Sequence, residues 1–160
     1  MELFNFNTQK DITHWKTIND VVMGGKSNSF FTLNEAGFGV FSGQVSLENN
    51  GGFSMLQYNF DKKNTSTFTR ACITVKGDGK TYQFRIKSNA TDKHSYIAIF
   101  DTISNWTTIE IPLNSMYPAF RGNVLNLPNY SGEHMAQIAF LIGNKKEEVF
   151  KLEIDSIILK

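Results

Sequence analysis

The chain has 160 residues, of which 41% are hydrophobic and 19% are charged, and its formal net charge is +1. This size and balance predict one soluble domain, spanning residues 1–160, with one substantial core. A charge so close to zero, without a long run of Lys or Arg, excludes the electrostatic footprint that nucleic-acid binding requires.

The N-terminal segment carries no targeting signal. Residues 1–6 contain no basic stretch followed by an apolar core, so we expect no secretory signal. No apolar run approaches the length of a membrane span. The single cysteine, Cys72, lies in an apolar, strand-like run and excludes a disulfide within the monomer. We therefore expect a cytoplasmic protein without a membrane span.

The first motif along the chain is a glycine pair, Gly24-Gly25. Segment 25–27, Gly-Lys-Ser, imitates the end of a phosphate-binding loop, but that motif needs a glycine where Asp20 stands. Residues 30–33 then have the pattern of a strand, so no helix N-terminus follows to bind an anion. The sequence therefore argues against a nucleotide site here.

Period-two alternation dominates from about residue 28 to the end, in short segments bounded by Gly, Asn, Asp and Pro. The clearest segment is 81–88, where Tyr82, Phe84 and Ile86 alternate with polar residues and predict one buried face. The other predicted strands span residues 29–33, 39–47, 54–60, 73–76, 95–100, 107–111, 137–142 and 149–158.

Two short stretches, 11–15 and 114–117, predict a helical turn or two, with Asp11 and Asn114 as N-caps. Segment 77–80, Gly-Asp-Gly-Lys, joins two predicted strands, and an Asp-Gly pair in that place favours a β-hairpin. Many short strands with glycine-rich turns and little helix predict a two-sheet sandwich or a barrel.

Four glycine-containing motifs occur in order over nearly the full length. They are Asp20-x-x-Met23-Gly24-Gly25-x-Ser27, Gly51-Gly52-Phe53, Gly77-Asp78-Gly79-x-x-Tyr82 and Phe120-Arg121-Gly122. This pattern resembles the complex I intermediate-associated protein 30 family, and Trp15, segment 106–112 and the closing Phe150-x-Leu152-x-Ile154 fit it as well. We interpret the motif residues as structural.

The resemblance implies an all-β, jelly-roll β-sandwich, similar to galactose-binding domains and carbohydrate-binding modules. It also implies a non-enzymatic role, as an assembly or chaperone-like factor that contacts other proteins, with respiratory complex I as the family's assembly target. The chain lacks a transit peptide, so we expect a stand-alone form of the family.

Catalytic and metal-binding candidates are missing from the sequence. His14, His94 and His134 are far apart, and none stands at metal-ligand spacing from another ligand, so we interpret them as surface or loop residues. Cys72 lacks the exposed, electropositive setting of a reactive thiolate. We expect no enzyme activity, cofactor or metal; an enzyme would need a pocket lined by Asp20, Arg121 and a histidine.

Arg121 follows a proline in a loop and offers a planar fork of five donors. It could bind a ligand carboxylate or sugar hydroxyls. Alternatively, it pairs with Asp20 and holds two loops together, which we favour because loop arginines often anchor structure.

Segment 96–100 is apolar on both faces. If Ile97 and Ile99 point inward, then Tyr96 and Phe100 face outward near Gln83, Arg85 and Trp106, and form a platform for a sugar or a protein. The opposite parity makes them ordinary core, and one sequence leaves the choice open.

The sequence thus favours a non-catalytic binding protein that contacts other proteins, and the alternative is a carbohydrate-binding module. The candidate contact residues are Asp20, Arg85, Tyr96, Trp106 and Arg121.

Overall fold

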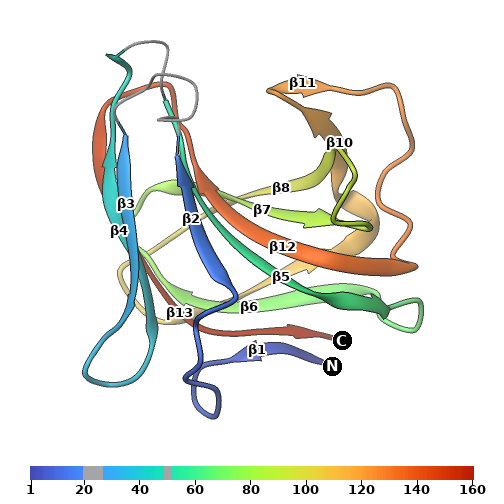
Figure 1. Ribbon diagram of the computed structural model, residues 1–160, viewed down its shortest axis with the longest axis horizontal. Coiled ribbons are helices and arrows are strands. Elements are labelled where there is room, and N and C mark those ends of the chain that lie inside the picture. The colour runs from blue at the N-terminus through green and yellow to red at the C-terminus, as the bar shows by residue number, and fades with distance from the viewer. Residues whose placement is uncertain (20–26, 49–51) are drawn as a thin grey trace.

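The computed structural model describes residues 1–19, 27–48 and 52–160, and shows two antiparallel β-sheets packed face to face (Figure 1). The strands are β1 (Glu2–Asn5), β2 (Trp15–Asn19), β3 (Asn28–Leu33), β4 (Gly39–Val45), β5 (Ser54–Asn64), β6 (Arg70–Lys76), β7 (Thr81–Lys87), β8 (Ser95–Asp101), β9 (Thr107–Pro112), β10 (Tyr117–Phe120), β11 (Asn123–Val124), β12 (His134–Ile142) and β13 (Glu148–Leu159). The predicted all-β sandwich is confirmed.

The smaller sheet, sheet A, has six strands in the order β3-β4-β13-β6-β9, with β1 paired to β13. The larger sheet, sheet B, has seven strands in the order β11-β10-β8-β7-β12-β5-β2. The first and last strands lie side by side in sheet A, and the Met1 amino group donates a hydrogen bond to the Leu159 carbonyl (2.8 Å). The two chain ends are therefore next to each other.

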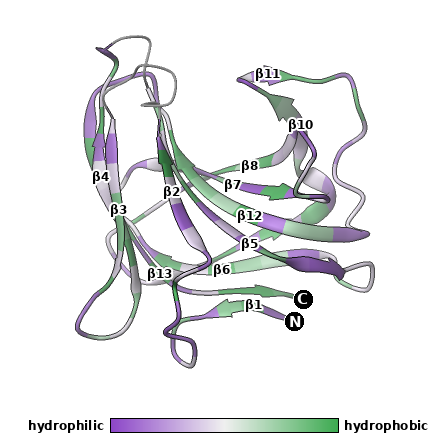
Figure 2. Ribbon diagram, viewed as in Figure 1, coloured by the Kyte–Doolittle hydropathy of each residue, from purple (hydrophilic) through white to green (hydrophobic). Residues whose placement is uncertain are grey.

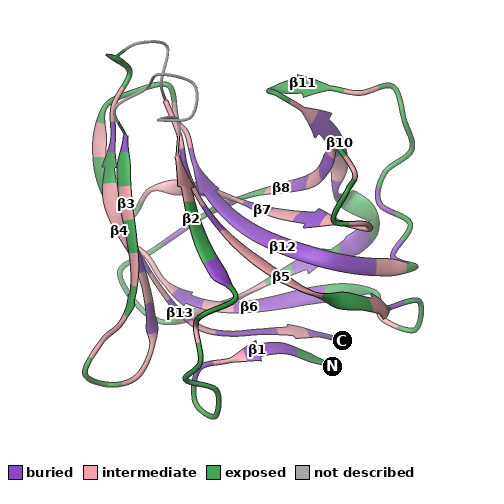
Figure 3. Ribbon diagram, in the orientation of Figure 1, coloured by how far each residue is buried: buried purple, intermediate pink, exposed green. Residues whose placement is uncertain are grey.

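The hydrophobic core fills the space between the sheets. Its large aromatic side chains include Phe41 and Phe150 from sheet A and Tyr82, Phe84 and Phe140 from sheet B. Alternation along β7 buries every second residue, as predicted for segment 81–88. In β12 every residue after His134 is buried, and Figures 2 and 3 show this strand as mostly hydrophobic and almost wholly buried.

The connection between β6 and β7 differs from the predicted hairpin. Strand β6 pairs with β13 and β9 in sheet A, whereas β7 pairs with β8 and β12 in sheet B. The Asp-Gly pair therefore turns the chain from one sheet to the other. Asp78 stabilises this corner by accepting hydrogen bonds from the Lys80 amide (3.2 Å), the Lys151 amide (2.8 Å) and the Tyr82 hydroxyl (3.0 Å).

Tyr82 makes this corner sensitive to alkaline pH. Burial raises the pKa of its hydroxyl, and the negative charge of Asp78 raises it further. In the unfolded chain the tyrosine pKa is about 10, and in the folded protein it is higher. The Tyr82 hydroxyl therefore contributes its full stabilisation below pH 10, and this contribution is lost as the pH rises further. Tyr82→Phe should cost about 1–2 kcal/mol at pH 8, and the difference from the parent should shrink at pH 11. Urea unfolding of both proteins measures this, and a difference that stays constant would contradict it.

Four strands were not expected from the sequence. Leu3 and Phe4 of β1 are buried in the core, but the strand is too short to show alternation. Strand β10 was not predicted because it contains Pro118, and proline within sheets is largely confined to edge strands and bulges. Strands β2 and β11 also lie at edges of sheet B.

The two predicted helical turns are only partly right. Segment 11–15 forms a turn in which the Asp11 carboxylate accepts the Thr13 amide (3.0 Å), but β2 begins at Trp15 in place of a helix. A 3-10 helix (η3) spans Leu113–Ser115, and Pro112 occupies its N-cap without a side-chain bond, so Asn114 is not the cap. The local signals were correct for a turn at both places; Asp11 caps the first turn with its side chain, whereas Asn114 does not cap the second.

Candidate functional site

The outer face of sheet B carries a row of side chains that crosses six strands. Strand register places Lys16 beside Gln57, Gln57 beside Ala139, Ala139 beside Arg85, Arg85 beside Ile97, and Ile97 beside Tyr117. Directly paired residues share one face of a sheet, so these side chains project to the same side. Their inward-pointing neighbours, such as Phe84 and Phe140, belong to the core.

Two neighbouring rows extend this face. In one row Gln83 lies between Leu141 and Ile99, and in the other Lys87 is paired with Gln137. The Gln137 amide donates a hydrogen bond to the Asn59 side-chain oxygen (2.7 Å), which ties β12 to β5. The central strands curve in Figure 1, and this face lies on the concave side, toward β10 and β11. The result is a curved surface of amides, cations and one phenol.

Arg85 stands near the centre of this surface and is poorly paired. Its Nε donates a hydrogen bond to Gln83 Oε1 (2.9 Å), and no carboxylate among the described residues forms an ion pair with it. Burial lowers the pKa of the guanidinium, and the nearby Tyr117 hydroxyl acts in the opposite direction. Among the described residues, Gln83 is the one partner with a side-chain hydrogen bond from Arg85, so the guanidinium fork keeps donors that a ligand could use.

Lys87 adds a second cation two residues further along β7. Its Nζ donates to the Asp92 backbone carbonyl (2.7 Å). Burial lowers the pKa of Lys87, Asp92 raises it, and the positive charge of Arg85 lowers it again. Among the described residues of this face that are paired across strands, one is acidic, Asp101 at the end of β8. Its carboxylate accepts a hydrogen bond from the Thr81 hydroxyl (2.6 Å). The centre of the face is therefore electropositive.

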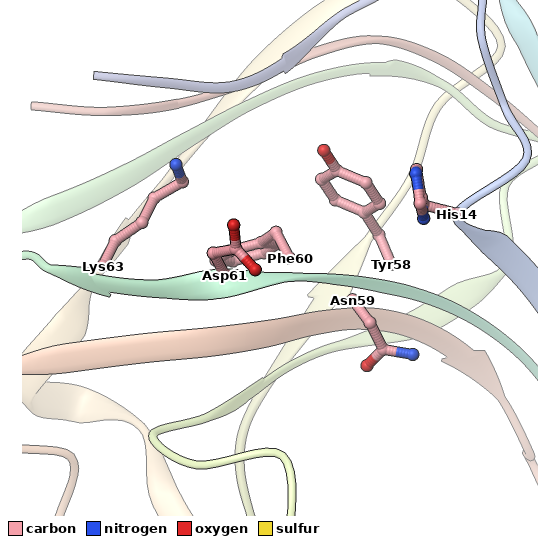
Figure 4. Close-up of a pocket in the computed structure, with 6 residues that line it drawn as sticks. All are labelled: His14, Tyr58, Asn59, Phe60, Asp61 and Lys63. Carbon is pink, nitrogen blue, oxygen red and sulfur yellow. The ribbon is translucent and has the colours of Figure 1, made fainter.

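A hollow of about 490 Å³ lies along β5, between residues 58–63 of this strand and His14, which precedes β2 (Figure 4). Its lining residues are His14, Tyr58, Asn59, Phe60, Asp61 and Lys63. In Figure 4 the Tyr58 and Lys63 side chains rise on one side of β5, and Asn59 points to the other. The Tyr58 ring stacks on Trp15 (centroids 4.7 Å apart), and burial followed by the charge of Asp11 raises its pKa. His14 lines this hollow as an exposed turn residue just before β2, which agrees with the surface or loop role suggested by the sequence.

The described residues contain no group of three or more His, Cys, Asp and Glu side chains placed to hold a metal ion. His94 lies beside Tyr96 (3.4 Å from Nε2 to the hydroxyl), and His134 begins β12. Cys72 is buried, with its Sγ 3.9 Å from a Glu110 carboxylate oxygen. No helix in the described part of the chain has the length and apolar character needed to cross a membrane.

Three of the predicted contact residues that the structure describes, Arg85, Tyr96 and Trp106, lie at different places. Arg85 lies on the outer face of sheet B, but Tyr96 and Phe100 point inward, so the second of the two parities is the one observed. Tyr96 packs against Tyr130 with ring centroids 5.0 Å apart. Trp106 is next to sheet A, where its ring contacts Phe38 (4.7 Å). The predicted platform of Tyr96, Phe100 and Trp106 is therefore wrong, because Tyr96 and Phe100 point toward the core and Trp106 packs against Phe38.

Arg121 is an exposed loop residue with a left-handed backbone (φ 49°), and its guanidinium lies over the Phe120 ring (5.2 Å to the centroid). Its suggested partner, Asp20, lies outside the described residues, as do Met23, Gly24, Gly25 and Gly51. The pairing of Arg121 with Asp20 stays a prediction.

The described motif residues have structural surroundings. Ser27 is buried, and its hydroxyl bonds to the amide (2.9 Å) and carbonyl (3.2 Å) of Ser46, which joins the segments flanking β3 and β4. Gly79 and Gly122 have φ of 82° and 80°, a conformation that side chains disfavour. Gly52 has a φ of 148°, and Phe53, which follows it, leads into β5.

Several residues of the outer face were not predicted, namely Gln57, Asn59, Lys87, Tyr117 and Gln137. Each is polar at an outward position of a strand, which is ordinary for any half-exposed sheet. Alternation in segments 54–60 and 81–88 could have placed them on polar faces. Their mutual proximity depends on the strand order β10-β8-β7-β12-β5, which one sequence does not reveal.

The fold defines a class of protein, the jelly-roll β-sandwich of the galactose-binding-domain type. The family 11 carbohydrate-binding module of the cellulosomal cellulase Lic26A-Cel5E of Clostridium thermocellum is similar, with a TM-score of 0.73 and 19% identity over 99% of this chain and 92% of that chain. The family 11 module of this organism in complex with a β-1,3-1,4-mixed-linked tetrasaccharide has a TM-score of 0.68 and 19% identity, covering 99% and 93%. An exo-β-agarase matches 99% of this chain and 24% of its own, with a TM-score of 0.59 and 11% identity.

The chain belongs to the Complex I intermediate-associated protein 30 (CIA30) family, whose sequence pattern matches residues 4–154. This confirms the family suggested by the four glycine motifs. A sequence comparison with functionally curated proteins gave no match. At such low identities the structural likenesses establish the fold alone.

Proposed function

We propose that this protein is a non-catalytic binding protein that holds a carbohydrate on the outer face of sheet B. The observation that carries the proposal is the cross-strand row containing Gln57, Arg85 and Tyr117, bordered by the amides of Gln83 and Gln137. Amides and guanidinium groups are planar, and their several donors and acceptors suit the hydroxyls of a sugar. The Tyr117 ring supplies an amphipathic contact at small entropic cost.

The curvature of sheet B supports the proposal, because a concave surface surrounds more of a ligand than a flat one. A module of the same fold, at 19% identity, has been solved in complex with a mixed-linked tetrasaccharide, so this architecture is compatible with sugar binding. Arg85, Gln57 and Tyr117 lie on three different strands, and their relative positions are therefore held by backbone hydrogen bonds.

Gln57→Ala should weaken binding to a responsive oligosaccharide about 5- to 10-fold, which corresponds to about 1–1.5 kcal/mol for one lost hydrogen bond. Calorimetric titration against a panel of neutral and acidic oligosaccharides measures the effect. The matched control is Gln44→Ala, since Gln44 is an exposed glutamine on β4 of sheet A and should leave the affinity unchanged. Failure of the parent protein to bind any sugar in the panel, or equal losses in both variants, would contradict the proposal.

A second candidate function is an assembly or chaperone-like factor for other proteins, and membership of the Complex I intermediate-associated protein 30 family favours it. In this function the outer face of sheet B would contact a protein partner. Affinity capture from the native cell, together with measurement of respiratory complex I assembly in a deletion strain, tests it. We expect a reproducible partner and a delayed assembly; normal assembly without a reproducible partner would count against this function.

A further inference from the structure

We infer that the ligand of this surface is an acidic sugar, and that Arg85 binds the carboxylate of a uronic acid residue. The inference rests on the proposed function and narrows its substrate class. It starts from a charge that the described residues leave unpaired: Arg85 is half-buried, yet its side-chain hydrogen bond goes to the neutral amide oxygen of Gln83 (2.9 Å).

The described surroundings of Arg85 do not supply a counter-charge. Its cross-strand neighbours are Ala139, which is 1% exposed, and Ile97, which is 4% exposed. Removing a cation from water costs free energy unless an anion compensates. The acid of this face, Asp101, pairs across the sheet with Thr81, at the far end of β7. The site therefore favours a ligand that brings its own negative charge.

A carboxylate is the anion that the geometry suits. The guanidinium fork can bind both carboxylate oxygens with two parallel hydrogen bonds, which gives a fixed orientation. Ala139 separates Gln57 from Arg85 in the row and is itself covered, so a ligand would contact the amide and the cation on either side of it. The amide of Gln57 could then bind a hydroxyl of the same sugar.

Lys87 adds positive charge beside Arg85 and so strengthens the preference for an anion. It lies on the same face of β7 as Arg85, two residues away, and its Nζ is already held by the Asp92 carbonyl (2.7 Å). The Asp92 carboxylate accepts the Asn89 amide (3.2 Å), so it is engaged within its own turn. Two cations, with no acid among the described residues at the centre, make this part of the face electropositive.

The test compares tetragalacturonate with its fully methyl-esterified form, which keeps the sugar backbone and removes the charge. Calorimetry at pH 7 should show at least 10-fold tighter binding of the acid, with the advantage falling as the salt concentration rises. Arg85→Gln should reduce the affinity for the acid to that for the ester. Arg85→Lys should recover only part of the loss, because an ammonium lacks the bidentate fork. Arg70→Gln, at an exposed arginine on β6 of sheet A, is the matched control and should leave both affinities unchanged.

The remaining outcomes show whether the acidic-sugar inference fails alone or together with the proposed carbohydrate binding. Equal binding of acid and ester, or binding of a neutral β-glucan oligosaccharide alone, would overturn the acidic-sugar inference and leave carbohydrate binding intact. Arg85-dependent binding of polyglutamate without binding of the uronate would overturn it in favour of an acidic protein partner. Binding of no sugar would overturn both. Unfolding of Arg85→Gln without ligand should occur at the same or higher urea concentration than for the parent, and a lower midpoint would mean that Arg85 serves the fold.

Discussion

Replacing Asp78 by alanine is expected to lower the free energy of unfolding by about 3–5 kcal/mol. The Asp78 carboxylate accepts backbone hydrogen bonds from Lys80 and Lys151 and a third from the Tyr82 hydroxyl. Because Tyr82 is 1% exposed, its hydroxyl would be left without a partner in the core. Hydrogen bonds to a charged acceptor are also stronger than neutral ones.

Urea unfolding monitored by circular dichroism measures this loss, and Asp61→Ala is the control. Asp61 is an exposed aspartate on β5 with no hydrogen bond to another described residue, so its replacement should change stability by less than about 0.5 kcal/mol. If both variants unfold at the same urea concentration as the parent, Asp78 does not stabilise the corner between the sheets.

Gly77→Ala is expected to destabilise the same corner by about 2–4 kcal/mol. A Cβ at this position would overlap the Cβ and Oγ1 atoms of Thr102, far inside van der Waals contact. Thr102 cannot easily move, because it is buried and its hydroxyl donates to the Lys80 carbonyl (2.8 Å). The Gly77 amide also donates to the Ile103 carbonyl (2.9 Å), which keeps the two segments close together.

Gly79→Ala separates this steric effect from backbone strain. Gly79 has a φ of 82°, but no atom of the described residues lies within 4 Å of the place a Cβ would take, so alanine there should cost only about 1–2 kcal/mol. We expect thermal unfolding in the order parent, Gly79→Ala, Gly77→Ala, from the most to the least stable. A smaller loss for Gly77→Ala than for Gly79→Ala would show that the close contact with Thr102 is not what requires glycine.

The fold could be predicted because its signals are local. Alternation in segment 81–88 reports a sheet with one apolar face, and nine of the strands follow from such runs and their turn residues. Pairing between strands could not be predicted in the same way, because it depends on tertiary packing. The Asp-Gly turn at Asp78 and Gly79 predicted a hairpin, whereas the chain passes between sheets, because β6 pairs with β13 and β9 and β7 pairs with β8 and β12. The Lys151 amide of β13 donates a hydrogen bond to Asp78 and helps to hold this turn.

The candidate site was predictable only at Arg85 and the adjacent Gln83. Gln57 and Tyr117, the neighbours of Arg85, are distant in sequence and meet through the order of five strands, which depends on tertiary packing. The parity of segment 96–100 was left open by the sequence for the same reason, since both of its faces are apolar. The structure resolves it, with Tyr96 and Phe100 inside and Ile97 and Ile99 outside.

The most direct test of the binding surface is a titration of the isotope-labelled protein with tetragalacturonate, followed by nuclear magnetic resonance of the backbone and side-chain N–H groups. We predict that the largest shifts occur at the Arg85 Nε–H and at the side-chain amides of Gln57, Gln83 and Gln137, all on the outer face of sheet B. Shifts centred on the hollow at His14 and Lys63 or on the outer face of sheet A, or the absence of any shift, would contradict the account.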